Sequence, residues 1–245
     1  MTRGEIIRYL ILRTLGNFLI LFTIFGLIST FGPALYYEVR YRVAQAQSVE
    51  FVTVEEEQGE TLRDIVNARS RQDATSSASR EPSIWDLIVR GEHEEVLVPK
   101  SAEFSIIIPK IGANQKVIAN VDPENRDVYY EALTQGIAHA KGSNFPGQDG
   151  TTYLFAHSAD VFWNVGRYNA DFYLIKDLVE GDDIVVIFNG ERYNYKMTEQ
   201  KIVDPTEVQY LTTDRGVGEE LVLQTCWPPG TTWKRLLVFA TPVSN

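Results

Sequence analysis

Apolar and polar positions are distributed very unevenly along this chain of 245 residues. Residues 14–37 contain no charged side chain, and the run is long enough to cross a bilayer core, which needs about 20 residues. A cleaved signal peptide has a shorter apolar region of about 7 to 15 residues, and a buried core helix is the less favoured alternative. We therefore predict a transmembrane signal anchor in residues 1–39. Arg3, Arg8 and Arg13 precede the span, which favours a cytoplasmic amino terminus and an extracytoplasmic remainder.

The next region, residues 40–98, is mainly polar. Acidic side chains dominate residues 55–58, and residues 70–82 are poor in aromatic and large apolar side chains. Such segments cannot bury enough apolar surface to offset the entropy lost on ordering. We expect an extracytoplasmic stalk that is partly disordered, with short helices at residues 59–68 and 83–88. The second helix is expected to dock on the following domain, and lying across an active-site groove is the alternative.

The remaining residues, 99–245, form short runs rich in β-branched and aromatic side chains, separated by Gly, Pro, Asn and Asp. Asn189 and Gly190 lie between two of these runs and supply the positive φ angles that a two-residue hairpin requires. The pattern predicts a mainly β domain, either a mostly antiparallel barrel or a sandwich. Strands are expected at residues 104–109, 116–121, 151–156, 184–188, 192–197, 221–225 and 236–240.

One short helix is expected in this domain, at residues 123–133, with Val128, Ala132 and Leu133 available to the core. Acidic side chains surround this segment and could hold calcium. A solvated helix face is the favoured interpretation, so we expect no cofactor. The acidic residues are Asp122, Glu124, Asp127 and Glu131.

Composition excludes several classes of function. The formal net charge of −10 argues against a nucleic-acid surface, and no basic run interleaved with aromatic residues contradicts this. The three scattered histidines do not have zinc-ligand spacing. A single cysteine excludes an intramolecular disulfide, and an unpaired thiol in an exported domain favours a use for that thiol.

The only cysteine, Cys226, ends the apolar run 221–225 and is followed by residues that stop a strand, Pro228, Pro229 and Gly230. Arg235 opens the next apolar run, so strand, short loop and strand would return its guanidinium to the sulfur. A fixed positive charge there favours a thiolate or a developing oxyanion. Considered alone, a single cysteine on an apolar strand is more often a small buried hydrophobe.

A second run, residues 151–156, ends at His157, and two strands ending in Cys and His suggest a catalytic pair. A strand end is a rigid mount, as catalytic geometry requires. His139 is the second candidate base, but it lies in a turn-rich segment and is less favoured. Residues 158–173 form an aromatic-rich loop, for which a cover over a peptide groove and a satellite hydrophobic cluster are equally favoured.

These residues resemble a known family, the sortases, whose hallmark is a strand ending Thr-Leu-x-Thr-Cys with an arginine several residues later. Residues 222–226, Val-Leu-Gln-Thr-Cys, followed by Arg235 are similar to it, with valine in place of the usual threonine. An apolar β-branched residue suits the same strand. Ala156 and His157 resemble the end of the family's histidine strand. Further similarity lies in residues 106–112, 136–147 and 178–184, in the family's order along residues 104–242.

The resemblance implies an eight-stranded β-barrel with short helices and a membrane-anchored cysteine transpeptidase. Cys226, His157 and Arg235 would be its catalytic residues. Its partners would be proteins that bear a C-terminal sorting signal of the Leu-Pro-x-Thr-Gly kind. An amine of the cell envelope or of a surface subunit would accept the acyl group from a thioester on Cys226.

Two other classes stay open. A cysteine peptidase or hydrolase would form the same thioester without amine transfer. A membrane-tethered β-barrel that only binds peptides would not need the thiol of Cys226.

Overall fold

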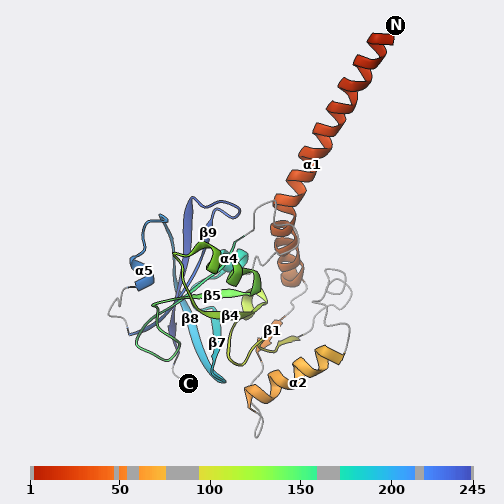
Figure 1. Ribbon diagram of the computed structural model, residues 1–245. Coiled ribbons are helices and arrows are strands. Elements are labelled where there is room, and N and C mark those ends of the chain that lie inside the picture. The colour runs from red at the N-terminus through yellow and green to blue at the C-terminus, as the bar shows by residue number, and fades with distance from the viewer. Residues whose placement is uncertain are drawn as a thin grey trace.

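The computed structural model describes residues 3–46, 50–53, 61–75, 94–158, 172–212 and 218–243. They form a long amino-terminal helix beside a β-barrel, with shorter elements packed around the barrel (Figure 1). Before the barrel come α1 (Arg3–Ala46), β1 (Glu50–Thr53), α2 (Leu62–Thr75) and β2 (Glu94–Leu97). The barrel strands are β3 (Phe104–Ile108), β4 (Ala113–Val121), β5 (Ile137–Ala140), β6 (Gly150–Phe155), β7 (Asp183–Phe188), β8 (Glu191–Val203), β9 (Glu219–Trp227) and β10 (Lys234–Pro242). Helices α4 (Arg126–Gln135) and α5 (Gln209–Thr212) and the 3₁₀ helices η1 (Pro109–Ile111) and η3 (Tyr173–Asp177) complete the described elements.

The barrel is closed, in the strand order β10-β8-β7-β3-β4-β5-β6-β9. Most neighbouring strands are antiparallel, but β4 pairs with β5 and β6 pairs with β9 in parallel. The prediction of an eight-stranded barrel with short helices is confirmed, and the sandwich is excluded because the strands form one closed sheet.

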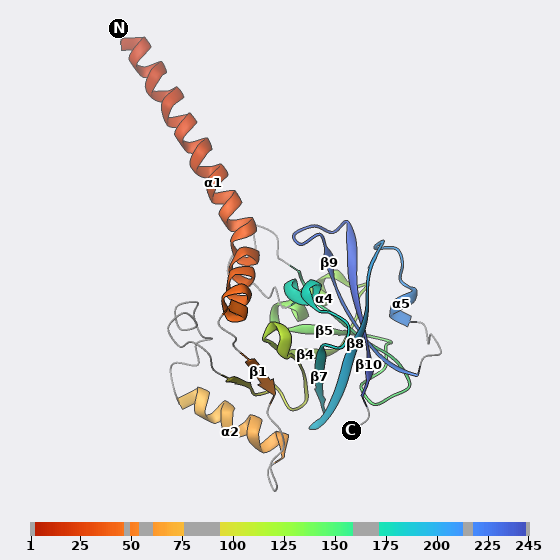
Figure 2. The ribbon, with the colours of Figure 1, turned by 180° about the vertical axis from the view of Figure 1, so that it is seen from behind.

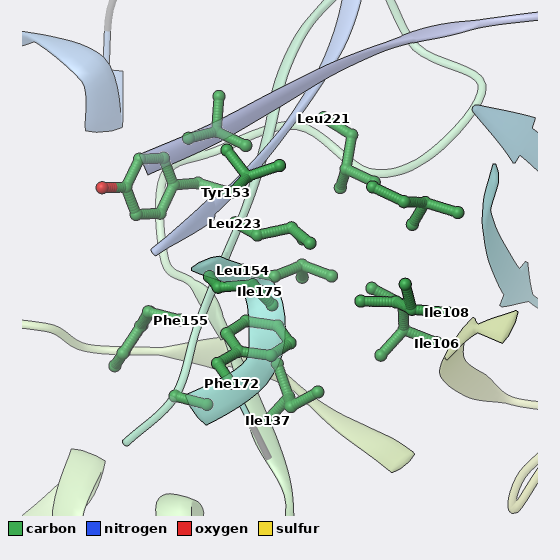
Figure 3. Close-up of a cluster of buried hydrophobic side chains, with 14 of the residues drawn as sticks. Ile106, Ile108, Ile137, Tyr153, Leu154, Phe155, Phe172, Ile175, Leu221 and Leu223 are labelled. Carbon is green, nitrogen blue, oxygen red and sulfur yellow. The ribbon is translucent and has the colours of Figure 1, made fainter. Parts of the chain in front are cut away.

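Apolar side chains from several strands fill the barrel. Leu221 and Leu223 of β9 belong to the same buried cluster as Ile106 and Ile108 of β3, and none of the four is more than 1% exposed (Figure 3). Burying one such side chain contributes about 2 kcal/mol. Because successive side chains of a strand point to opposite faces, Cys226 and every second residue before it lie on the other, outer face of β9.

The hairpin between β7 and β8 forms as predicted. Phe188 and Glu191 are paired across the turn. The two residues of the turn, Asn189 and Gly190, have φ angles of 53° and 84°, respectively. Positive φ at both central residues matches the right-handed twist of the two strands, so this local prediction is confirmed.

α1 is a single helix of 44 residues, about 66 Å long at the usual rise per residue. Its segment Arg3–Ile28 is long and apolar enough to cross a membrane by length and composition. The helix continues past the predicted boundary at residue 39, and its carboxy-terminal part lies beside the barrel (Figure 2). There Tyr41 is only 8% exposed, and Glu38 lies 3.0 Å from Lys176 of η3.

Part of the expected stalk packs on the barrel. α2 begins after Thr61, whose hydroxyl donates to the Asp64 carboxylate at 2.8 Å. Leu62 is 1% exposed and packs in one cluster with Ile107 of β3 and Val185 of β7. The sequence predicted a helix at residues 59–68, whereas α2 runs to Thr75 and includes residues 70–75 of the segment expected to be disordered. The contact with the barrel was not predicted, because a polar segment does not indicate that the barrel has an apolar outer face. These described residues therefore do not form a free tether.

Other parts of the stalk prediction lie outside the described residues, namely residues 55–58, 76–82 and the expected helix at 83–88. The described residues 50–53 and 94–97 form β1 and β2, which pair in parallel as a two-stranded sheet.

Two local predictions differ from the structure. The segment 137–140, expected to be turn-rich, is strand β5, which is short and takes its partners from β4 and β6. In α4, Ala132 and Leu133 are buried as expected, but Val128 is 44% exposed. Val128 stays exposed in the first turn of α4, although it shares a helix face with Ala132 four residues later.

Candidate active site

Cys226 and Arg235 are paired directly across the antiparallel strands β9 and β10. Residues directly opposite each other project from the same face of a sheet, with Cβ atoms about 5 Å apart. The short connection between the strands brings the guanidinium back to the thiol, as the sequence predicted. Arg235 Nη1 donates to the carbonyls of Thr232 and Lys234, both at 3.1 Å. These bonds hold the guanidinium at the turn.

His157 is brought to the same end of the sheet by the parallel pairing of β6 with β9. Phe155 is the register partner of Gln224, and the Ala156 amide donates to the Gln224 carbonyl at 3.1 Å. The Thr225 hydroxyl donates to the Ala156 carbonyl at 3.1 Å. If the register of β6 and β9 is extended by two residues beyond the pair of Phe155 and Gln224, His157 falls opposite Cys226. The three residues selected from the sequence therefore come from three adjacent strand ends.

The sheet face next to the thiol is apolar with a few polar groups. The Tyr153 hydroxyl donates to Gln224 Oε1 at 2.8 Å, and Tyr153 is 1% exposed. Burial raises the pKa of the Tyr153 hydroxyl, and the positive charge of Arg235 partly offsets this. Farther along the face, Tyr210 of α5 packs edge-on against Phe239, with ring centroids 5.7 Å apart. The face is therefore covered at that end and approachable near Cys226, which is half-buried.

Helix α4 contributes aromatic side chains that the sequence prediction missed. The rings of Tyr130 and His157 lie 5.7 Å apart between centroids, and those of Tyr129 and Phe155 lie 6.5 Å apart. Arg126 lies over the Tyr130 ring at 5.0 Å. The spacing of Arg126 and Tyr130, one helical turn apart, was a usable signal for one shared face, but it did not indicate which element that face meets.

The thiol lies in an environment that does not favour the thiolate by itself. Burial raises the pKa of Cys226, and the positive charge of Arg235 acts in the opposite direction as the smaller effect. The thiol is therefore protonated at neutral pH, since its ordinary pKa is already 9.0. A nucleophilic role therefore requires a base that removes the proton.

His139, the second candidate base, is placed elsewhere. Its register partner is Leu154 of β6, whose side chain points into the buried cluster shown in Figure 3. His139 is 0% exposed, its Nδ1 accepts from the Asn120 amide at 3.2 Å, and its Nε2 donates to the Asn144 carbonyl at 3.0 Å. Burial lowers the pKa of His139. This side chain ties the 143–145 loop to the barrel and lies on the opposite face from Cys226.

Among the described residues, no group of three or more His, Cys, Asp or Glu side chains could hold a metal ion. Asp122, one of the acidic residues considered for calcium, accepts from the Glu124 amide at 3.0 Å and lies 3.6 Å from Lys141. Of the aromatic-rich loop, residues 159–171 lie outside the described part of the chain. Phe172 at its end is 0% exposed in the barrel core.

Known proteins are similar to this chain in sequence and in fold. The sortase domain family model matches residues 106–243. Sortase D of Bacillus subtilis (strain 168) is 27% identical over 140 residues, which are 56% of this chain and 62% of that protein. The chain thus spans less than two thirds of the length of this relative.

Solved structures with a similar fold include sortase C1 of GBS pilus island 1. It has a TM-score of 0.50 at 20% identity, over 75% of this chain and 82% of that chain. Sortase C1 from Streptococcus suis has a TM-score of 0.49 at 24% identity, over 59% of this chain and 75% of that chain. The family match spans the strand ends that carry His157, Cys226 and Arg235. With more than half of its length matched by the family model, the chain belongs to the sortase family, whose members are cysteine transpeptidases.

Proposed function

We propose that this protein is a membrane-anchored sortase that cleaves a short C-terminal sorting signal and transfers the acyl group to an amine. The observation that carries the proposal is the register pairing of Cys226 with Arg235, beside the strand end that bears His157. Nucleophile, base and cation would then act on one substrate carbonyl.

The first step is acylation. His157 takes the proton of the Cys226 thiol, whose raised pKa keeps it protonated at rest. The sulfur attacks the scissile carbonyl carbon and forms the S–C bond, and Arg235 stabilises the negative charge that develops on the carbonyl oxygen. One such interaction is often worth about 3 kcal/mol. The C–N bond then breaks, and the imidazolium of His157 gives its proton to the departing amine.

The second step resolves the thioester. An incoming amine attacks the thioester carbon and forms a new amide bond, and its proton returns to His157. Cys226 leaves as thiolate and takes the proton back from His157. Water can replace the amine and gives slow hydrolysis.

The substrate that fits this proposal is a signal of the Leu-Pro-x-Thr-Gly kind in a protein at the same membrane. The accepting amine belongs to the cell envelope or to a surface subunit. α1 provides a single-pass anchor through Arg3–Ile28, with the barrel on the extracytoplasmic side and the basic amino terminus inside. This position places the barrel where exported substrates emerge.

The decisive experiment incubates the full chain in detergent micelles with a library of sorting peptides and identifies acyl adducts by mass spectrometry. We expect an adduct on Cys226, a transfer product when oligoglycine is added, and neither in Cys226→Ala. Hydrolysis that oligoglycine does not divert would instead indicate a cysteine peptidase. Peptide binding retained in Cys226→Ala, with no adduct on the native thiol, would indicate a binding barrel.

A further inference from the structure

Within the described part of the chain, the ring of Tyr130 in α4 lies against His157 from outside the strands. The ring of Tyr130 lies 5.7 Å from the imidazole between centroids, with the two planes inclined by 57°. β6 ends at Phe155, so His157 lies beyond the last residue of the strand. The pairing with β9 fixes the backbone up to Ala156, and a ring against the imidazole restricts the side-chain rotation that backbone bonds leave free.

Tyr130 is itself held from two sides. The Arg126 guanidinium lies over its ring at 5.0 Å, and the ring of Tyr129 lies 5.0 Å away at an angle of 34°. Tyr130 raises the pKa of Arg126, chiefly through a side-chain hydrogen bond. The helix that carries these residues begins with a cap, because the Asn125 side chain accepts from the Val128 amide at 3.3 Å. The Tyr130 ring is therefore in contact with two side chains of its own helix, Arg126 and Tyr129.

A second contact joins the same helix to the histidine segment. Tyr129 packs edge-on against Phe155 at 6.5 Å and 72°, and Phe155 precedes His157 by two residues. Tyr129 is also close enough to the thiol that Cys226 and Arg235 influence its pKa, which burial raises. Two neighbouring tyrosines of α4 thus contact the end of β6 at two points.

We propose that Tyr130 is a positioning residue for His157. The Tyr130 ring, in contact with Arg126 and Tyr129, holds the imidazole of His157 toward Cys226 during acylation. The inference rests on the proposed function, because it assigns His157 a proton transfer that needs a fixed direction. A catalytic group misplaced by 1 Å can lose about 100-fold in rate.

The test compares Tyr130→Leu and Tyr130→Phe in the full chain, labelled with ¹⁵N-histidine in detergent micelles. The chain contains three histidines, so the imidazole signals of His157 can be assigned by their loss in His157→Gln. Val128→Ala is the matched control, because Val128 lies on the same helix and is 44% exposed. Far-UV circular dichroism and the thermal midpoint verify that each variant is folded.

We expect Tyr130→Leu to shift the His157 imidazole signals and to lower the kcat of peptide acylation about 10-fold to 100-fold, with KM changed less than about 3-fold. Tyr130→Phe keeps the ring and should remain within about 3-fold of the native kcat. Val128→Ala should match the native chain in both readouts. The pH profile of acylation should also change in Tyr130→Leu, because this profile reports the proton transfer by His157.

Unchanged His157 signals in Tyr130→Leu would overturn the inference, and so would a raised KM at native kcat, which would make Tyr130 a substrate contact. If Tyr130→Leu does not fold, Tyr130→Met provides the same comparison with a flexible apolar side chain. Failure of the proposed function would give a different experimental result from failure of this inference. In that case no acyl adduct forms on Cys226 even in the native chain, while the histidine signals still report whether Tyr130 holds the imidazole.

Discussion

Glu38 of α1 accepts a hydrogen bond at 3.0 Å from Lys176 of η3, although the two residues are 138 positions apart in the chain. Lys176 also lies 2.5 Å from Asp177, and its ammonium lies 4.9 Å from the Tyr173 ring centroid. The side chains of Glu38 and Lys176 are each about one fifth exposed (21% and 19%). The helix that contains the candidate membrane span is thus joined to the barrel by a partly buried ionic contact.

This contact should measurably stabilise the full chain. In a double-mutant cycle with Glu38→Gln and Lys176→Met, we expect a coupling free energy of about 1 kcal/mol, near the upper end for an ion pair that is not fully buried. Thermal or chaotrope unfolding in detergent micelles provides the measurement. Arg42→Gln is the control, because Arg42 pairs with the same carboxylate at 2.8 Å but is 71% exposed. Additive effects of the two substitutions would contradict the prediction.

The same contact predicts a pH dependence. The hydrogen bond from Lys176 is the largest influence on Glu38 and lowers its pKa below the ordinary value of 4.5. A carboxyl group with a lowered folded-state pKa adds stability above its unfolded pKa and loses it as the pH falls through the folded value. The native chain should therefore lose stability below about pH 4.5 more steeply than Glu38→Gln. Parallel curves for the two chains would show that Glu38 does not contribute.

The thiol of Cys226 should titrate above its ordinary pKa. Burial raises the pKa from 9.0, and only the thiolate reacts quickly with an alkylating reagent. We expect the rate of iodoacetamide labelling to be low at neutral pH and to have its midpoint above pH 9.0. Since the chain has one cysteine, intact-mass spectrometry reports this site directly. A midpoint below 9.0 would mean that the thiolate is stabilised by a neighbouring cation more strongly than burial opposes it.

Arg235 should matter for rate more than its neighbour Lys234. If its guanidinium stabilises the oxyanion, Arg235→Ala should lower the kcat of acylation about 100-fold to 1,000-fold. Arg235→Lys should recover only part of this, because an ammonium lacks the planar fork of donors. Lys234→Gln is the matched control, since Lys234 binds Asp204 at 2.7 Å and precedes Arg235 on the same strand. Similar losses at residues 234 and 235 would indicate a general charge effect.

His139 should act on stability and not on chemistry. Burial lowers its pKa below 6.5, so the unfolded state takes up the proton first as the pH falls. The contribution of neutral His139 is complete above pH 6.5 and is lost as the pH falls from there toward the folded-state pKa. His139→Leu should cost about 2 kcal/mol by leaving the Asn120 amide unpaired, and it should remove this pH dependence.

The measurement for His139 is the thermal midpoint between pH 5 and pH 8, compared with His157→Gln. We expect His157→Gln to keep the slope near pH 6 and to lose acylation, and His139→Leu to do the reverse at a temperature where it remains folded. Loss of acylation in folded His139→Leu would contradict the prediction that His139 acts on stability and not on chemistry.

The sequence predicted those parts of the site whose residues lie near one another along the chain. Cys226 and Arg235 lie on two strands joined by a short loop, and such strands usually pair with each other, so their juxtaposition could be predicted. His157 could be selected because a strand end and the family resemblance agreed. Tyr130 could not, because nothing in its helix indicates which strand end the ring will meet.

The amino-acid sequence alone determined the apolar amino-terminal span, seven of the eight barrel strands and the Asn189-Gly190 hairpin, because these depend on local periodicity and on φ angles. Only the tertiary structure decided the parallel pairing of β6 with β9 and the inward face of His139. It also decided the docking of α1 through Glu38. These features join segments that are distant in the chain, and their energies exist only when the barrel is closed.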